Sequence, residues 1–172
     1  MDILSHALWG GVGFGRKNRS DFWAAFMLGM SPDLLAFGIP SITRIITALS
    51  GNGLPEEFHR NMAYFPSYVF TLYSIGHSLV IFTLAFIAVW IFRKKPYIPL
   101  FAWFFHIFLD IFTHSIDFFP TPFLWPLSDY HFDGQSWGQP LIFIPNVLLL
   151  FAAYGYWAWM RRKDKMLQFK DS

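Results

Sequence analysis

The sequence predicts an all-α protein: a single domain over residues 1–172, folded as a polytopic helical membrane bundle of four to five spanning or partly spanning segments. Hydrophobic residues make up 55% of the chain and charged residues only 14%, with a mean hydropathy of +0.38. Several apolar stretches reach the roughly 20 residues that a helix needs to cross ~30 Å of hydrocarbon. The basic residues gather in clusters next to these stretches, which is typical of loops on the cytoplasmic side.

Five segments carry most of the apolar residues. They are residues 2–15, 21–39, 67–92, 97–119 and 140–160. We expect the last four to be spanning helices, with the second interrupted at Ser31-Pro32-Asp33 because proline removes a helical donor. The first is apolar and glycine-rich but short, so it is a partial span, a re-entrant piece or a short helix packed within the bundle.

The basic residues predict an orientation. Residues 16–19, 93–95 and 161–170 together hold 11 of the 13 Lys and Arg residues. Alternating spans can place all three clusters in the cytoplasm, as the positive-inside rule favours. We therefore expect residues 40–66 and 120–139 to be external loops. The C-terminus is then cytoplasmic, and the protein lies in the cytoplasmic membrane of a bacterium or archaeon.

Six ionisable residues lie within the apolar segments: His6, Asp33, His77, His106, Asp110 and His114. The last three are spaced four apart, so a continuous helix would place them along one face. In the predicted orientation five of the six lie toward the outer face, with His106 just beneath them. Imidazoles and carboxylates are costly in hydrocarbon unless they are compensated. A bound cation is the simplest compensation.

The types of residue favour a divalent metal. Neutral imidazole and carboxylate suit Zn²⁺, with Mn²⁺ or Fe²⁺ as alternatives. The chain has no cysteine, so the ligands must be nitrogen and oxygen atoms. The candidate ligands exceed what one tetrahedral ion needs. Either one ion with supporting carboxylates, or two ions about 3.5–4 Å apart, would account for the excess.

The external loops carry further candidate residues. Asp129, His131 and Asp133 alternate, so an extended segment would turn them to one side, as a lid or a substrate contact. A solvated loop with an Asp-Gly turn is the alternative. Arg60 is a candidate contact for an anionic head group, or else a surface residue. No glycine-rich phosphate loop precedes a helix, and nothing indicates binding to nucleic acid.

The ordered motifs of the chain resemble the YdjM-type family of membrane-bound, metal-dependent hydrolases. The matching motifs are Ser5-His6-Ala7-Leu8, Ser31-Pro32-Asp33, Gly76-His77-Ser78-Leu79 and His106-x-x-x-Asp110-x-x-Thr113-His114. The resemblance implies a helical membrane hydrolase with a divalent metal, held by His6, Asp33, His77, His106 and Asp110. The chain departs from the family at Leu35, where a second acid is common, and at residues 72–74, where His-Arg-Gly is common.

We therefore expect a metal-dependent hydrolase that acts on a lipid-linked substrate at the outer face of the membrane. A phosphoester is the first expected bond, and an amide or ester is the second. Whichever of Asp110 and Asp33 is not fully engaged as a ligand is the expected general base. The alternatives are a metal or proton transporter that uses the same residues along a path, and a non-catalytic membrane assembly protein. The sequence carries no sign of the oligomeric state.

Overall fold

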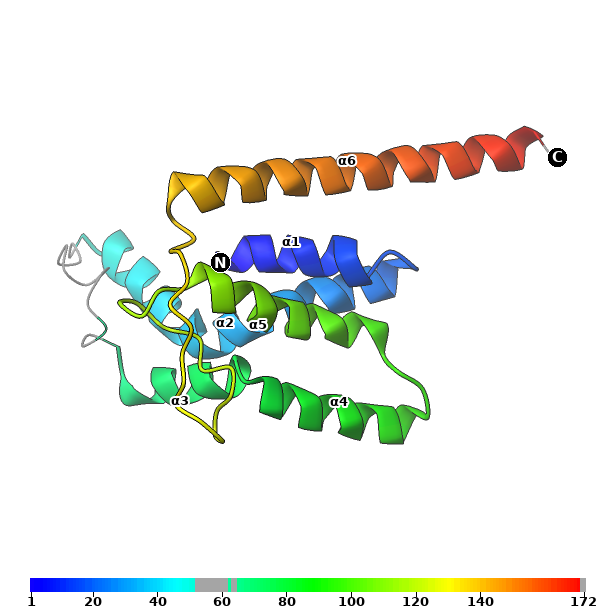
Figure 1. Cartoon of the computed structure of the whole chain (residues 1–172). Coiled ribbons are helices and arrows are strands. Elements are labelled where there is room, and N and C mark those ends of the chain that lie inside the picture. Colours follow the sequence, from blue (N-terminus) through cyan, green and yellow to red (C-terminus); the bar gives the residue numbers. More distant parts are fainter. Residues whose placement is uncertain (52–61, 63–64, 171–172) are drawn as a thin grey trace.

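The computed structural model of the chain describes residues 1–51, 62 and 65–170, and within these residues the fold is entirely helical (Figure 1). The elements are α1 (Ile3–Phe14), α2 (Arg19–Leu49), α3 (Ser67–Gly76), α4 (Leu79–Arg93), the 3₁₀ turn η3 (Ile98–Leu100), α5 (Phe101–Thr113) and α6 (Pro140–Lys170). Helix α1 packs against α2, α5 and α6, while α2 also packs against α3 and α5. The all-α prediction is confirmed for the described residues.

Two helices are long and apolar enough to cross a membrane: α2, and the Pro140–Asp164 part of α6. Helices α3 and α4 qualify as a third span only as a pair, because they are bent by 56° at the break between them. Helix α1 and the Ile98–Thr113 segment are shorter apolar helices. Two or three spans are therefore supported within the described residues, and the expected four to five are not confirmed.

Large apolar side chains lie on the outer faces of the long helices. Ile42 in α2, Phe92 in α4 and Phe151 in α6 are 59%, 87% and 74% exposed. Apolar surface of this extent is unfavourable in water but is stable against lipid chains. The composition and this surface together indicate an association with a membrane.

Helix α2 is longer than expected and is not interrupted. It continues through Pro32 and Pro40 to Leu49, so the predicted break at Ser31-Pro32-Asp33 is wrong and residues 40–49 are helical rather than part of a loop. Pro32 cannot donate to the carbonyl of Leu28, four residues earlier. The Ser31 hydroxyl donates to that carbonyl instead, at 3.1 Å. A side chain thus replaces the missing backbone donor, as is common in membrane helices.

The single helix predicted over residues 67–92 is in fact two. Helix α3 ends at Gly76, and Ser78 caps the start of α4, its hydroxyl accepting hydrogen bonds from Val80 N and Ile81 N at 3.1 and 3.2 Å. Serine is a favoured residue at this position because it satisfies the free N–H groups of the first turn. The same hydroxyl donates to the carbonyl of Trp125. The capped break leaves His77 between the two helices.

The helix predicted over residues 97–119 is shorter than expected. Helix α5 ends at Thr113, and His114 has extended backbone angles, φ −118° and ψ 137°. The expected single helical face therefore holds for His106 and Asp110 but not for His114. Beyond the helix, three N–H groups of residues 134–137 donate to the carbonyls of residues 112–114, each at 2.9 Å. The 120–139 segment thus satisfies carbonyls that the end of α5 leaves unpaired.

Small residues allow α1 to lie directly against α2. A Cβ on Gly10 would collide with the carbonyl oxygen of Ala25, and one on Gly29 would lie 2.5 Å from the carbonyl oxygen of His6. Close approach through small residues is a common way for membrane helices to pack. This contact places His6 beside the side chains of α5.

Candidate metal centre

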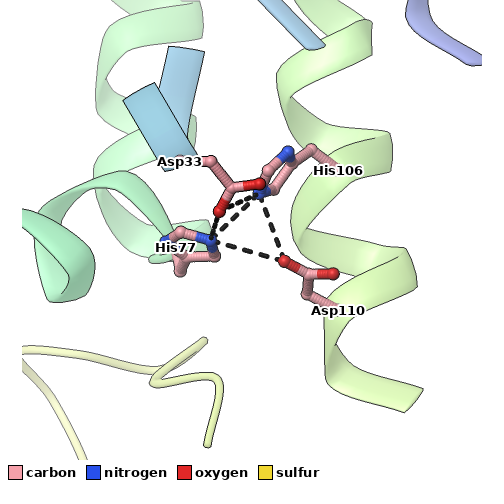
Figure 2. Close-up of side chains that lie close together, drawn as sticks. All are labelled: Asp33, His77, His106 and Asp110. Carbon is pink, nitrogen blue, oxygen red and sulfur yellow. Dashed lines mark hydrogen bonds and ion pairs between the residues drawn. The ribbon is translucent and has the colours of Figure 1, made fainter. Parts of the chain in front are cut away.

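Four buried side chains from three parts of the chain meet inside the bundle (Figure 2). Asp33 comes from α2, His77 from the break between α3 and α4, and His106 and Asp110 from successive turns of α5. Each is at most 4% exposed. Each offers one ligand atom, and the four atoms lie within 4.8 Å of one another, so this Asp/His group can hold a metal ion.

The separations between the ligand atoms suit one ion. Nε2 of His77 lies 2.9 Å from Nε2 of His106, and Oδ2 of Asp110 lies 3.4 and 3.2 Å from these two atoms. Oδ1 of Asp33 lies 3.5 Å from the first nitrogen and 3.8 Å from the second. Ligands at about 2.0–2.1 Å from a tetrahedral ion are roughly 3.3 Å apart. The observed distances lie close to this value.

Backbone carbonyls determine the tautomer of both histidines. Nδ1 of His77 lies 2.9 Å from the carbonyl oxygen of Tyr73, and Nδ1 of His106 lies 2.7 Å from that of Gly29. A carbonyl oxygen only accepts hydrogen bonds, so each Nδ1 carries a proton. In a neutral ring each Nε2 is then unprotonated and carries a lone pair. Two lone pairs 2.9 Å apart repel each other. A cation close to both nitrogens would turn this repulsion into attraction.

One oxygen of each carboxylate also lacks a donor. Oδ2 of Asp33 and Oδ2 of Asp110 are buried and accept no hydrogen bond within the described part of the chain. A buried carboxylate oxygen without a partner is costly, and a cation offsets that cost. Two imidazole nitrogens and two carboxylate oxygens form a donor set that suits a divalent ion such as zinc. The residues present therefore fit the metal that the sequence implies.

The other two expected ligands lie on the far side of Asp110. Nε2 of His6 is 2.9 Å and Nε2 of His114 is 3.6 Å from Oδ1 of Asp110, the oxygen that faces away from His77. The ring of His6 stacks on that of His106, with centroids 3.7 Å apart. These two histidines contact a member of the Asp/His group without belonging to it.

A cavity of about 460 Å³ adjoins the group, and its wall includes Asp33, His114 and Arg44. The rest of the wall is mainly apolar and includes Phe37, Phe65 and Phe119. The guanidinium of Arg44 lies 4.8 Å from the ring centre of Phe65. Sequence analysis missed Arg44, because residues 40–66 were expected to be a loop. The available signal was its spacing of eleven residues from Asp33, about three helical turns on the same face.

The predicted lid residues lie elsewhere. Oδ1 of Asp133 accepts a hydrogen bond from Ile116 N at 3.1 Å, Asp129 is exposed, and His131 is partly exposed. The structure therefore does not bring these three into the Asp/His group, although Trp137 from the same segment lines the cavity. Arg60 lies outside the described residues.

Tyr73 is a neighbour of the group that sequence analysis also missed. Its ring stacks on His77, with centroids 3.8 Å apart, and its hydroxyl donates to the carbonyl of Phe119 at 2.8 Å. The signal was an aromatic residue one helical turn before His77.

Comparison with protein-family models, with curated proteins and with solved structures finds no match for this chain. The Asp/His group and the cavity beside it are therefore the basis for a proposed function.

Proposed function

We propose that this chain is a metal-dependent membrane hydrolase similar to the YdjM-type family, and that it cleaves a lipid-linked substrate, a phosphoester ahead of an amide or ester. One observation carries the proposal: the Nε2 atoms of His77 and His106 lie 2.9 Å apart beside two buried carboxylates. Zinc is the proposed ion, with manganese or iron as alternatives. When bound, such an ion supplies Lewis-acid polarisation and a nucleophile at neutral pH.

Asp33 is the proposed general base. It is the only carboxylate of the Asp/His group that also lines the cavity where a substrate would lie, and within the described residues histidines contact it through Oδ1 alone. Asp110 is instead contacted through both of its oxygens by histidines. This difference favours a proton-accepting role for Asp33 and a holding role for Asp110.

The cavity supports an amphiphilic substrate. Its aromatic and aliphatic wall suits the apolar part of a lipid, and Arg44 suits an anionic head group. Part of the wall belongs to α2, one of the two helices that qualify as membrane spans. Together with the predicted orientation of the basic clusters, this supports a reaction at head-group depth near the outer face.

Metal content is the first test of the proposal. The full chain, purified in detergent with added Zn²⁺ and no chelator, should contain at least one equivalent of metal by elemental analysis. His106→Ala and His106→Gln should lose it, whereas His131→Ala should keep it, because that imidazole lies outside the Asp/His group. Less than a tenth of an equivalent in the unmodified chain would mean that a shared proton compensates His77 and His106, and the proposal would be wrong.

Hydrolysis is the second test. Metal-loaded protein would be incubated with a phospholipid, a polyprenyl phosphate and an N-acyl amide, and the products followed by mass spectrometry. Asp33→Asn should retain metal but lower the rate by roughly 10²–10⁴-fold, the usual contribution of a general base. Unchanged turnover in that variant would remove Asp33 from the role of base. Hydrolysis that persists after complete removal of metal would contradict the metal-dependent mechanism.

A further inference from the structure

Asp110 contacts different histidines through its two oxygens. Oδ2 lies near His77 and His106, at 3.4 and 3.2 Å, whereas Oδ1 lies near His6 and His114, at 2.9 and 3.6 Å. We propose that Oδ1, His6 and His114 form a second cation site, so that Asp110 bridges two metal ions. This inference rests on the metal-dependent function proposed above and extends it.

The tautomer of His114 supports this second site. Its Nδ1 lies 2.9 Å from the carbonyl oxygen of Phe119, so Nδ1 carries the proton. In the neutral ring Nε2 is then unprotonated and carries a lone pair. That nitrogen lies 3.6 Å from Oδ1 of Asp110, and in the neutral ring neither atom can donate a hydrogen bond to the other. Unlike the pair His77 and His106, these two acceptors already share a cationic donor, because the α-amino group of Met1 lies against both of them. A divalent ion would take the place of that group.

A positive charge already lies at this position. The α-amino group of Met1 donates to Oδ1 of Asp110 and lies 3.1 Å from Nε2 of His114. His6 contributes a second unusual feature, because it is only 1% exposed and its Nδ1 has no hydrogen-bond partner among the described residues. As the structure stands, Nε2 of His6 donates to Oδ1 of Asp110. Because Nδ1 has no partner among these residues, moving the proton to Nδ1 breaks no other hydrogen bond and leaves Nε2 with a lone pair that could bind an ion.

The two sites open onto the same cavity. Asp33 from the first group and His114 from the second both line it. Two divalent ions and the two carboxylates of Asp33 and Asp110 carry a net charge of +2, before the α-amino group of Met1 is counted, and a buried site can offset this charge with an anionic substrate. Paired ions about 3.5–4 Å apart are a recurring arrangement in phosphoester hydrolysis. The second site therefore favours a phosphoester over a neutral amide or ester.

Reloading with manganese tests the inference. The full chain in detergent would be stripped with a chelator, dialysed, and reloaded with Mn²⁺, and metal content would be measured together with the electron paramagnetic resonance spectrum. We expect two equivalents and an exchange-coupled signal. His114→Ala and His114→Gln should each keep about one equivalent with an uncoupled signal, and that retained ion shows that the variant has folded. His131→Ala, the matched control, should behave like the unmodified chain.

Each result decides between one ion and two. One equivalent and an uncoupled spectrum in the unmodified chain would overturn the second site while leaving the proposed hydrolase intact. Two coupled ions in the His114 variants would overturn the assignment of His114 as a ligand. Less than a tenth of an equivalent in the unmodified chain would overturn both the second site and the proposed function. Loss of the coupled signal in the His114 variants, with one ion retained, would support a pair of ions bridged by Asp110.

Discussion

Replacing Gly29 with alanine should disturb the metal centre without altering any ligand. A Cβ at this position would lie 2.5 Å from the carbonyl oxygen of His6, whereas ordinary contacts are 3.4–4 Å. Because the obstacle is backbone, α1 and α2 must separate by about 0.9 Å, the difference between 2.5 and 3.4 Å. The carbonyl of Gly29 also holds the ring of His106 at 2.7 Å. The separation of the two helices therefore displaces His6 on one side of Asp110 and His106 on the other.

The expected magnitudes follow from this displacement. Overpacking of a closely packed contact costs about 1–3 kcal/mol of stability. Loss of the hydrogen bond that orients a metal-binding histidine typically lowers metal affinity about 10–100-fold. A shift of about 1 Å in a catalytic geometry can also lower the rate about 10²-fold.

Calorimetric titration with Zn²⁺ and thermal unfolding in one detergent would measure both effects. The matched control is Gly38→Ala, in the same helix, where an added Cβ meets no atom within 4 Å. Alanine there should raise stability by up to about 1 kcal/mol through helix propensity alone. If Gly29→Ala bound zinc as tightly as the unmodified chain, or unfolded at the same temperature as Gly38→Ala, the close helix contact would not be what positions the centre.

Three further changes test the surroundings of the centre. Ser78→Ala removes the cap of α4 and should cost about 1 kcal/mol in thermal unfolding, whereas Thr83→Ala, one turn further on, should cost less because its hydroxyl bonds only within the helix. Gly134→Ala would place a Cβ 2.5 Å from the carbonyl oxygen of Phe112 and should lower the unfolding temperature and metal content. Gly138→Ala, which meets nothing within 4 Å, should leave both unchanged. Asp129→Cys introduces the only cysteine of the chain, and an impermeant thiol reagent should label it in intact cells; labelling only after lysis would reverse the predicted orientation.

The sequence predicted the helical class because composition and apolar run length are local properties. It did not predict where the helices end. Proline at positions 32 and 40 favours a break on local grounds, yet α2 continues because the Ser31 hydroxyl and packing against neighbouring helices replace what proline removes. The reverse error occurred at His77-Ser78, where an unbroken apolar run concealed a break that is capped by Ser78 and held by Trp125 from a distant segment.

The candidate site was predictable in its residue types and only partly in its arrangement. The spacing of His106 and Asp110 placed both on one helical face, since four residues are about one turn. Their meeting with Asp33 and His77 depends on contacts between helices that one sequence does not reveal. The sequence does not indicate which of the four candidate histidines face Oδ1 of Asp110 and which face Oδ2. That division is the basis of the proposed second ion.

Three of the four histidines around Asp110 share a property that determines how the centre responds to change. His77, His106 and His114 each donate Nδ1–H to a backbone carbonyl, at 2.9, 2.7 and 2.9 Å, rather than to a side chain. No substitution of one residue's side chain can remove such a carbonyl, so the orientation of each ring depends on where the surrounding backbone lies. The centre should therefore tolerate most changes of neighbouring side chains that leave the helices in place. It should be sensitive to any change, such as Gly29→Ala, that moves one helix relative to another, even when every ligand is retained.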